Sequence, residues 1–188
     1  KHKLRSGKLY REAPQPKAQE KAPAGEIEVL RDSAVAVGQK TGLAAPFYLA
    51  RAQFFDRKGE YRKALPGYNQ YDSLTHTVDP TFFYARYKCE TKLRMWQQAL
   101  LDIARTCYLA PKEPTYFAEW ASLDLRVKRI DEGISAAKAC INLAPEYADG
   151  YLLLGLLQRE KGLKQESIEN LKKAQELGDT RAEEYLKQ

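Results

Sequence analysis

The sequence predicts an all-α fold, a right-handed superhelical solenoid of stacked antiparallel helix pairs. A block of 34 residues begins at Pro80 and recurs from Pro114 and from Ala148. Side chains of one type recur at fixed places in the blocks, in an aromatic, a small-residue and a closing column: Phe83, Phe117, Tyr151; Ala99, Gly133, Ser167; and Pro111, Pro145, Asp179. Each block also holds two runs of apolar residues at helical spacing. Because a pair of short helices leaves one face uncovered, each pair is stable only when it stacks on its neighbours.

The first element is a basic tail or linker at residues 1–25, rich in Pro, Ala and Lys and without an apolar period. Residues 1–26 hold seven Lys or Arg and three Asp or Glu, so they carry a net charge of +4 out of the chain's +6. The remaining residues therefore carry a net charge of only about +2. A basic tail on a nearly neutral solenoid argues against nucleic-acid binding.

The second element is an N-terminal capping helix predicted at residues 26–43. Ile27, Leu30, Ala34 and Val37 recur there at helical intervals, and Gly38 follows them. We expect this helix to cover the first helix of the first repeat unit.

The repeat domain is predicted to span residues 44–188. Extending the columns backwards with one inserted residue gives four units and a closing helix, at residues 45–79, 80–113, 114–147, 148–181 and 182–188. Small residues on both helices of a unit would let the two backbones approach closely, with Tyr87 as the large exception. Pro66 fits if its helix starts near Lys63, because the N–H groups of a first turn are unpaired in any case.

These blocks resemble tetratricopeptide repeats (TPR), whose helix-turn-helix unit of 34 residues has this pattern of aromatic, small and proline positions. The last block matches best, at Tyr151, Leu154, Gly155, Gly162, Ser167, Leu171 and Ala174. The resemblance implies a scaffold for protein–protein interaction. In such a scaffold the first helices build a concave face that holds an extended peptide or a helix of the partner.

The resemblance also implies candidate binding residues on that concave face. The matching inner-wall positions are Tyr84, Lys88, Lys92, Arg126, Leu152, Leu156 and Arg159. This wall is basic with apolar patches, so a protein or peptide with acidic residues or a free carboxylate would suit it. That these are ordinary solubilising charges is an open alternative. Repeats that clamp the acidic C-terminus of chaperones are not matched, because Glu119 would repel the carboxylate that such a site must hold.

No cofactor, metal site or catalytic set is predicted. Cys107 and Cys140 fall in second-helix columns and are expected to be small buried residues, whereas Cys89 has no partner nearby in the sequence. The chain has no Cys-x-x-Cys pair, and its two histidines, His2 and His76, fall in the tail and in a loop, which argues against a zinc site. Since no nucleophile or acid–base pair with an orienting group is recognisable, the sequence predicts a noncatalytic protein.

Two alternatives to a free-standing scaffold stay open at this point. One is an accessory interaction region of a larger or membrane-anchored protein, with residues 1–25 as the linker; a membrane contact would then need an anchor upstream of Lys1. The other, least favoured, is an enzyme that would need Glu119, Lys88 and Arg126 at hydrogen-bond distance. The start at Lys1 slightly favours a periplasmic or cell-envelope location over a cytoplasmic one, and the odd count of three cysteines argues against a disulfide framework but not against export.

Overall fold

The computed structural model describes residues 42–187. The predicted tail at 1–25 lies outside these residues, as does the predicted capping helix at 26–43 apart from its last two positions, which precede the first helix described. Nine helices and no strand are present in the described part of the chain: α2 (Ala44–Arg57), α3 (Tyr61–Thr75), α4 (Pro80–Lys92), α5 (Trp96–Leu109), α6 (Pro114–Arg126), α7 (Ile130–Leu143), α8 (Ala148–Glu160), α9 (Lys164–Glu176) and α10 (Arg181–Leu186).

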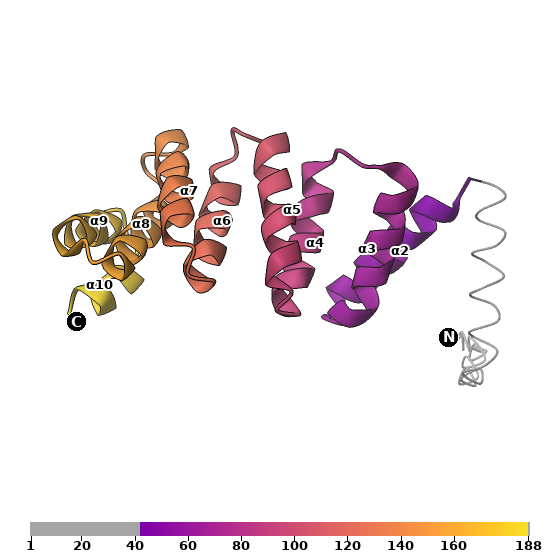
Figure 1. The fold of residues 1–188 in the computed structure, drawn as a ribbon, viewed down its shortest axis with the longest axis horizontal. Coiled ribbons are helices and arrows are strands. Elements are labelled where there is room, and N and C mark those ends of the chain that lie inside the picture. Colours follow the sequence, from indigo (N-terminus) through magenta and orange to yellow (C-terminus); the bar gives the residue numbers. More distant parts are fainter. Residues whose placement is uncertain (1–41, 188) are drawn as a thin grey trace, which may run out of the picture.

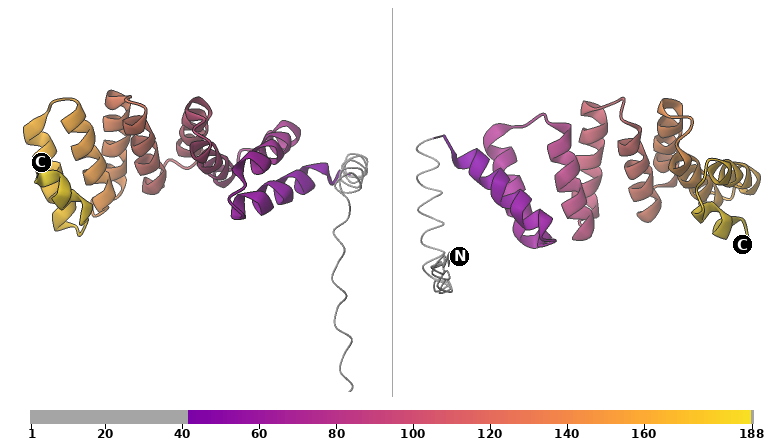
Figure 2. Two further views of the ribbon diagram at one scale, coloured as in Figure 1. Left: turned by 90° about the horizontal axis from the view of Figure 1, so that it is seen from below. Right: turned by 180° about the vertical axis from the view of Figure 1, so that it is seen from behind.

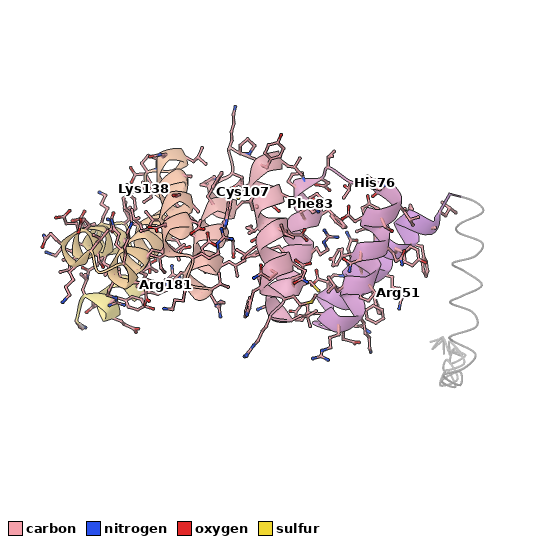
Figure 3. All side chains as sticks on the ribbon, in the orientation of Figure 1. Arg51, His76, Phe83, Cys107, Lys138 and Arg181 are labelled. Atoms are coloured by element: carbon pink, nitrogen blue, oxygen red, sulfur yellow. The ribbon has the colours of Figure 1, made fainter. Side chains whose placement is uncertain are left out.

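The helices form pairs that stack in one row from α2 to α10 (Figures 1 and 2). Within the pairs, α2 packs on α3, α4 on α5, α6 on α7 and α8 on α9. Neighbouring pairs meet where α3 contacts α4, α5 contacts α6 and α7 contacts α8, and α10 packs on α9 at the C-terminal end. Side chains fill the spaces between the ribbons (Figure 3). The prediction of an all-α solenoid of stacked helix pairs is confirmed.

The starts of α4 and α6 follow directly from the local sequence. Asp79 caps α4 by accepting a hydrogen bond from the backbone N–H of Thr81 at 2.8 Å, and Pro80 occupies the first helical position, where no N–H is needed. In α6 Glu113 accepts from the N–H of Thr115 at 3.4 Å in the same way. The repeated acidic residue before proline therefore fixes where the first helix of a unit begins.

The condition under which Pro66 would fall in a first turn is not met. α3 begins at Tyr61, two residues before Lys63, so Pro66 lies inside the helix. The helix nevertheless continues to Thr75, and Pro66 is exposed. The lost hydrogen bond to the carbonyl of Arg62 therefore falls on the solvent side of the helix, where water can replace it.

The small residues lie where two helices of one unit touch. The members of both small-residue columns are buried: Ala52, Ala121, Gly155, Ala64, Ala99, Gly133 and Ser167. A Cβ added at Gly155 would stand 2.8 Å from Cγ of Leu171, so the contact between α8 and α9 leaves no room for one. The large exception, Tyr87, is buried against Ala99 and Leu123 at the junction of the second and third units.

The three cysteines are free thiols and all are buried, as expected for Cys107 and Cys140. Burial raises the pKa of the thiols of Cys89 and Cys107 to about 12 and that of Cys140 to about 11, so all three are protonated at neutral pH. Within residues 42–187, no group of three potential metal-ligating side chains lies close together. In the same part of the chain, every helix is too short or too polar to cross a membrane.

Candidate functional site

One face of α4 carries three of the predicted binding residues. Tyr84, Lys88 and Lys92 are spaced by four residues, so they lie in line along the helix. Both lysines are exposed, and Tyr84 is half-buried. The ammonium nitrogen of Lys88 lies 4.8 Å from the centre of the Tyr84 ring, a cation–π contact that holds the two side chains together.

A groove of about 300 Å³ lies between this face of α4, the facing side of α6 and the start of α5. We call it the basic groove; it is lined by Tyr87, Thr91, Lys92, Arg94, Trp96, Glu119, Ser122, Leu123 and Arg126. The structure thus brings together the predicted residues Lys92 and Arg126, which come from different repeat units. Tyr84 and Lys88 lie beside the groove on α4.

Glu119 is the carboxylate among the lining residues, and two phenols hold it. The hydroxyl of Tyr87 donates to Oε2 at 3.0 Å, and the hydroxyl of Tyr84 donates to Oε1 at 3.4 Å. Burial, followed by the negative charge of Glu119, raises the pKa of Tyr84 to about 12 and raises that of Tyr87 further. Both phenols therefore remain hydrogen-bond donors at neutral pH, and they occupy acceptor sites that a cation would otherwise take.

Three cationic side chains line the groove with this carboxylate, Lys92, Arg94 and Arg126, and a fourth, Lys88, lies beside it on α4. In residues 42–187 none of the four has an ion pair within 4.0 Å. The guanidinium carbon of Arg126 instead lies 5.8 Å from the ring centre of Trp96. The groove and its edge therefore carry an excess of positive charge, and an anion bound there would relieve the repulsion between the cations.

Arg94 and Trp96 were not among the predicted site residues. Arg94 adopts the left-handed conformation, with φ of 59°, at the turn position where the first and last units have Gly59 and Gly162. A side chain costs about 1 kcal/mol or more in this conformation. The replacement of a turn glycine by arginine is the signal in the sequence that could have pointed to Arg94. Lys128, at the same position of the third unit, has φ of 64° and pairs with Glu160 at 2.5 Å.

The three predicted residues of α8 lie apart from the basic groove, at the end covered by α10. Leu152 is only 3% exposed and packs with Leu171 and Ala182, so its assignment to an accessible binding wall is wrong. Leu156 packs against the same core. Arg159 lies over the ring of Tyr185 at 5.0 Å. Because the closing helix occupies this end, the fourth unit offers less of its first helix to a ligand than the repeat pattern implied.

The cleft that would have given the enzyme alternative more weight, with Glu119, Lys88 and Arg126 at hydrogen-bond distance, is not formed in the described residues. Glu119 is hydrogen-bonded by Tyr84 and Tyr87, and no hydrogen bond or ion pair joins it to Lys88 or Arg126. What the basic groove offers chemically is cationic hydrogen-bond donors, Arg94 and Arg126 among them, beside two aromatic surfaces, Tyr87 and Trp96. Such a combination suits recognition of carboxylates.

The structure resembles several solved TPR proteins. YrrB, described as a TPR protein with an unusual peptide-binding site, has 19% sequence identity and a TM-score of 0.74, and the match covers 87% of this chain and 86% of YrrB. MamA from Desulfovibrio magneticus RS-1 has 22% identity and a TM-score of 0.68 over 76% of this chain and 81% of MamA. TTC0263, a thermophilic TPR protein from Thermus thermophilus, has 20% identity and a TM-score of 0.55 over 73% of this chain and 76% of that protein.

No protein-family model and no curated protein matches the sequence. At the identities found among the solved structures, the likeness concerns the fold. The chain has the TPR fold, so the resemblance inferred from the repeated columns is confirmed at that level.

Proposed function

We propose that this protein is a noncatalytic scaffold that binds an acidic peptide segment of a partner protein in the basic groove. The observation that carries the proposal is the charge of the groove, which is lined by three cations, Lys92, Arg94 and Arg126, and one carboxylate that two phenols already hold. Carboxylates of the peptide would pair with Lys92, Arg94 and Arg126, and an apolar residue would contact Trp96. YrrB, of the same fold, is described as having a peptide-binding site, which supports a peptide as the ligand.

The groove also limits which acidic peptides fit. Glu119 lies on the α6 side and would repel a carboxylate placed directly against it. We therefore expect the acidic residues of the ligand to lie on the side of Lys92 and Arg94, with an uncharged residue opposite Glu119. A peptide with spaced acidic residues should bind better than an unbroken run of them.

The proposal is tested with the full chain and an array of peptides of about 12 residues that differ only in the number and spacing of Asp and Glu around a fixed apolar residue. Dissociation constants follow from fluorescence anisotropy of labelled peptides. We expect the variant Lys88→Glu/Lys92→Glu/Arg126→Glu to bind the preferred acidic peptide at least about tenfold more weakly, and the affinity of the parent chain to fall with salt.

The matched control is Lys138→Glu/Lys164→Glu/Lys172→Glu, which makes the same change in net charge at exposed positions of α7 and α9. It should lose less than about twofold in affinity, since those lysines lie on helices that do not line the basic groove. Circular dichroism must show that both variants are folded. Equal losses in the two variants, or equal binding of lysine-rich peptides, would refute groove binding.

A further inference from the structure

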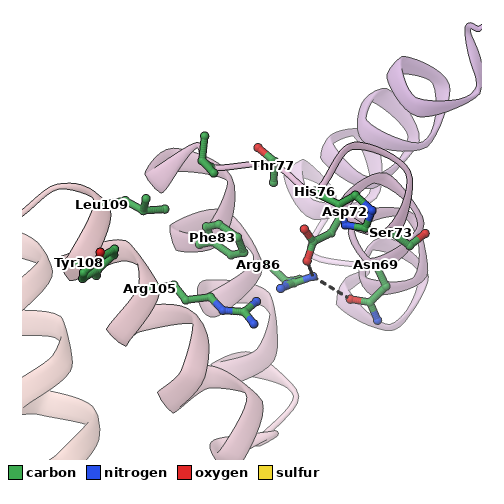
Figure 4. Close-up of a pocket in the computed structure, with 11 residues that line it drawn as sticks. Asn69, Asp72, Ser73, His76, Thr77, Phe83, Arg86, Arg105, Tyr108 and Leu109 are labelled. Carbon is green, nitrogen blue, oxygen red and sulfur yellow. Dashed lines mark hydrogen bonds and ion pairs between the residues drawn. The ribbon is translucent and has the colours of Figure 1, made fainter.

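A second groove lies on the side of the solenoid formed by the second helices, where the first unit meets the second. Its volume is about 550 Å³, larger than that of the basic groove. Figure 4 shows the end of α3 on one side and α5 on the other, with α4 side chains between them. We call it the outer groove; its main walls and floor are Asp72 and His76, Arg105 and Tyr108, and Phe83 and Arg86.

The α5 side of the outer groove, and the adjoining face of α5 outside its lining, expose large apolar residues. Tyr108 is 84% exposed, and Leu101, seven residues earlier on the same face of α5, is 63% exposed. The third and fourth units, which align with the second without an insertion, have polar residues at the same two positions: Ser135 and Asn142 in α7, and Glu169 and Glu176 in α9. The second unit therefore departs from the repeat by placing apolar surface where its neighbours keep polar surface, and Val78 at the opposite rim is 76% exposed as well.

The charges of the outer groove differ from one wall to the other. Arg86 is fully engaged: it donates to both oxygens of Asp102, at 2.6 and 2.9 Å, and to Asp72 at 2.9 Å. Arg105 is not, because its nearest carboxylate oxygen, on Asp102, lies 3.9 Å away and its side chain is 55% exposed. The guanidinium of Arg105 lies over the ring of Phe83, at 5.3 Å from the centre. The exposed face of α5 thus presents a weakly paired cation, Arg105, between two apolar residues, Leu101 and Tyr108.

We propose that the outer groove, together with the adjoining face of α5 that carries Leu101, binds an amphipathic helix of a partner protein, whose apolar residues contact Leu101 and Tyr108 and whose central carboxylate pairs with Arg105. The three residues follow a spacing of four and three along α5, which matches the spacing of side chains on one face of a helix lying alongside it. This site is separate from the basic groove and goes beyond the proposed function. It would let the scaffold hold two partners on its two faces.

A second copy of this chain does not fit the outer groove equally well. If α5 packed antiparallel on α5 of another copy about a twofold axis, Leu101 would meet Tyr108, but Arg105 would lie opposite Arg105 of the second copy. Two like charges facing each other across an apolar contact disfavour that pairing. An acidic residue at the same place is favoured, which is why the proposal names a partner with a carboxylate at the centre of its apolar face.

The test is a selection of displayed helical peptides, about 18 residues long and varied on one face only, on the full chain. Enriched peptides should share two apolar residues spaced by seven, with Asp or Glu between them. Their affinity should fall at least about tenfold for Leu101→Ser/Tyr108→Asn, which installs the residues that α7 has at these places. It should fall comparably for Arg105→Glu, and a peptide with Lys in place of the acid should recover it.

Three results would overturn the proposal. The first is a selection that enriches no such peptide, or peptides that bind Leu101→Ser/Tyr108→Asn as tightly as the parent chain. The second is loss of their binding in Lys88→Glu/Lys92→Glu/Arg126→Glu, which would move them to the basic groove. The third, from sedimentation, is a dimer of the parent chain that Leu101→Ser/Tyr108→Asn dissociates, which would make a second copy the occupant. A failure of the basic groove to bind acidic peptides leaves each of these readouts unaffected.

Discussion

The junction between the first two units and the junction between the last two are built by different means. Where α3 meets α4, the contact is polar and aromatic: Arg86 of α4 pairs with Asp72 of α3, and the rings of Tyr68 and Phe82 meet edge to face at 5.7 Å. Where α6 and α7 meet α8, the contact is aliphatic, with Leu153, Leu154 and Leu157 packed on small residues. There α6 also touches α8 directly, so both helices of the third unit contact the fourth.

This contrast shows that neighbouring repeat units can be joined either by charged groups or by close packing, and that the two kinds of junction have different consequences. Small residues allow the close approach of α8: Gly150, for example, lies so near Cys140 that an added Cβ would be 3.2 Å from its sulfur. The outer groove lies at the polar junction and is lined in part by rings and guanidinium groups, those of Phe83, Tyr108, Arg86 and Arg105. Stability should accordingly depend on charge partners in the first half and on packing in the second.

The largest effect on the polar junction is expected from Arg86→Met. The substitution leaves Asp102, which is 2% exposed, without its buried counter-ion and breaks the link to Asp72. Removing one partner of a buried ion pair costs about 3–5 kcal/mol, because a buried charge is left uncompensated. The free energy of unfolding in urea, followed by circular dichroism, measures the loss. A cost below about 1 kcal/mol would show that the polar junction contributes little.

The next effect is expected from Gly67→Ala in α3. An added Cβ would stand 2.8 Å from the carbonyl oxygen of Tyr48 and 3.0 Å from Cβ of Ala52, so α2 would have to move. We expect a cost of about 2 kcal/mol in the urea experiment. The matched control is Gly133→Ala, where the added Cβ would be 2.7 Å from Cδ2 of Leu157. Because that atom is the end of a flexible side chain and not backbone, the control should cost less than Gly67→Ala, and the reverse order would contradict this explanation.

A smaller, pH-dependent effect is expected at Glu90, which is 4% exposed. Burial, followed by the charge of Asp102, raises the pKa of Glu90 from 4.5 to about 8, although the charge of Arg86 opposes the shift. The folded state therefore binds a proton that the unfolded state releases, so the stability from this group is complete below about pH 4.5 and is lost as the pH rises towards 8.

Glu90→Gln should remove that dependence. We expect it to stabilise the protein by roughly 1–3 kcal/mol at about pH 9 and to have little effect at about pH 4.5. Urea unfolding at a series of pH values gives the difference between the two chains. The comparison is Asp124→Asn in the third unit, where burial raises the pKa of the carboxyl from 3.8 to about 6, so its gain should appear at lower pH. If the difference in stability between the parent chain and one of these variants did not change with pH, the pH dependence could not be assigned to the carboxyl that the variant removes.

The smallest effect is expected from Lys161→Ala in the second half. Lys161 pairs with Asp131 at 2.6 Å, but their side chains are 46% and 77% exposed. Exposed pairs contribute about 0–1 kcal/mol and are screened by salt, so we expect a loss below about 0.5 kcal/mol. The urea midpoint at low and at high salt measures it. A loss as large as that of Arg86→Met would erase the contrast between the two halves.

Much of the fold could be predicted because the repeated sequence columns indicate it directly. The columns of Phe83 and Ala99 and their counterparts mark which side of each helix is buried, and the acidic residue before Pro80 and Pro114 marks where helices begin. The start of α3 could not be predicted in this way. Pro66 would fit a first turn only if the helix began near Lys63, but α3 begins at Tyr61, whose side chain packs against the core cluster that contains Ala52 and Ala64.

The candidate site could be predicted in part. Tyr84, Lys88, Lys92 and Arg126 lie in or beside the basic groove, because the spacing along a helix determines which side chains share a face. Arg94 and Trp96 were missed because they come from a turn and from a second helix. Whether such residues reach the groove depends on how two units stack.

The amino-acid pattern alone specified the number of units, the pairing of helices and the buried columns, since these follow from periodicity within a chain segment. The basic and outer grooves between units and the burial of Leu152 by the closing helix became visible only in the folded molecule. These features escape the pattern because side chains of two units must share one interface. The geometry of that interface depends on the shapes and charges of both sides, such as Arg86 with Asp72, rather than on the pattern of either.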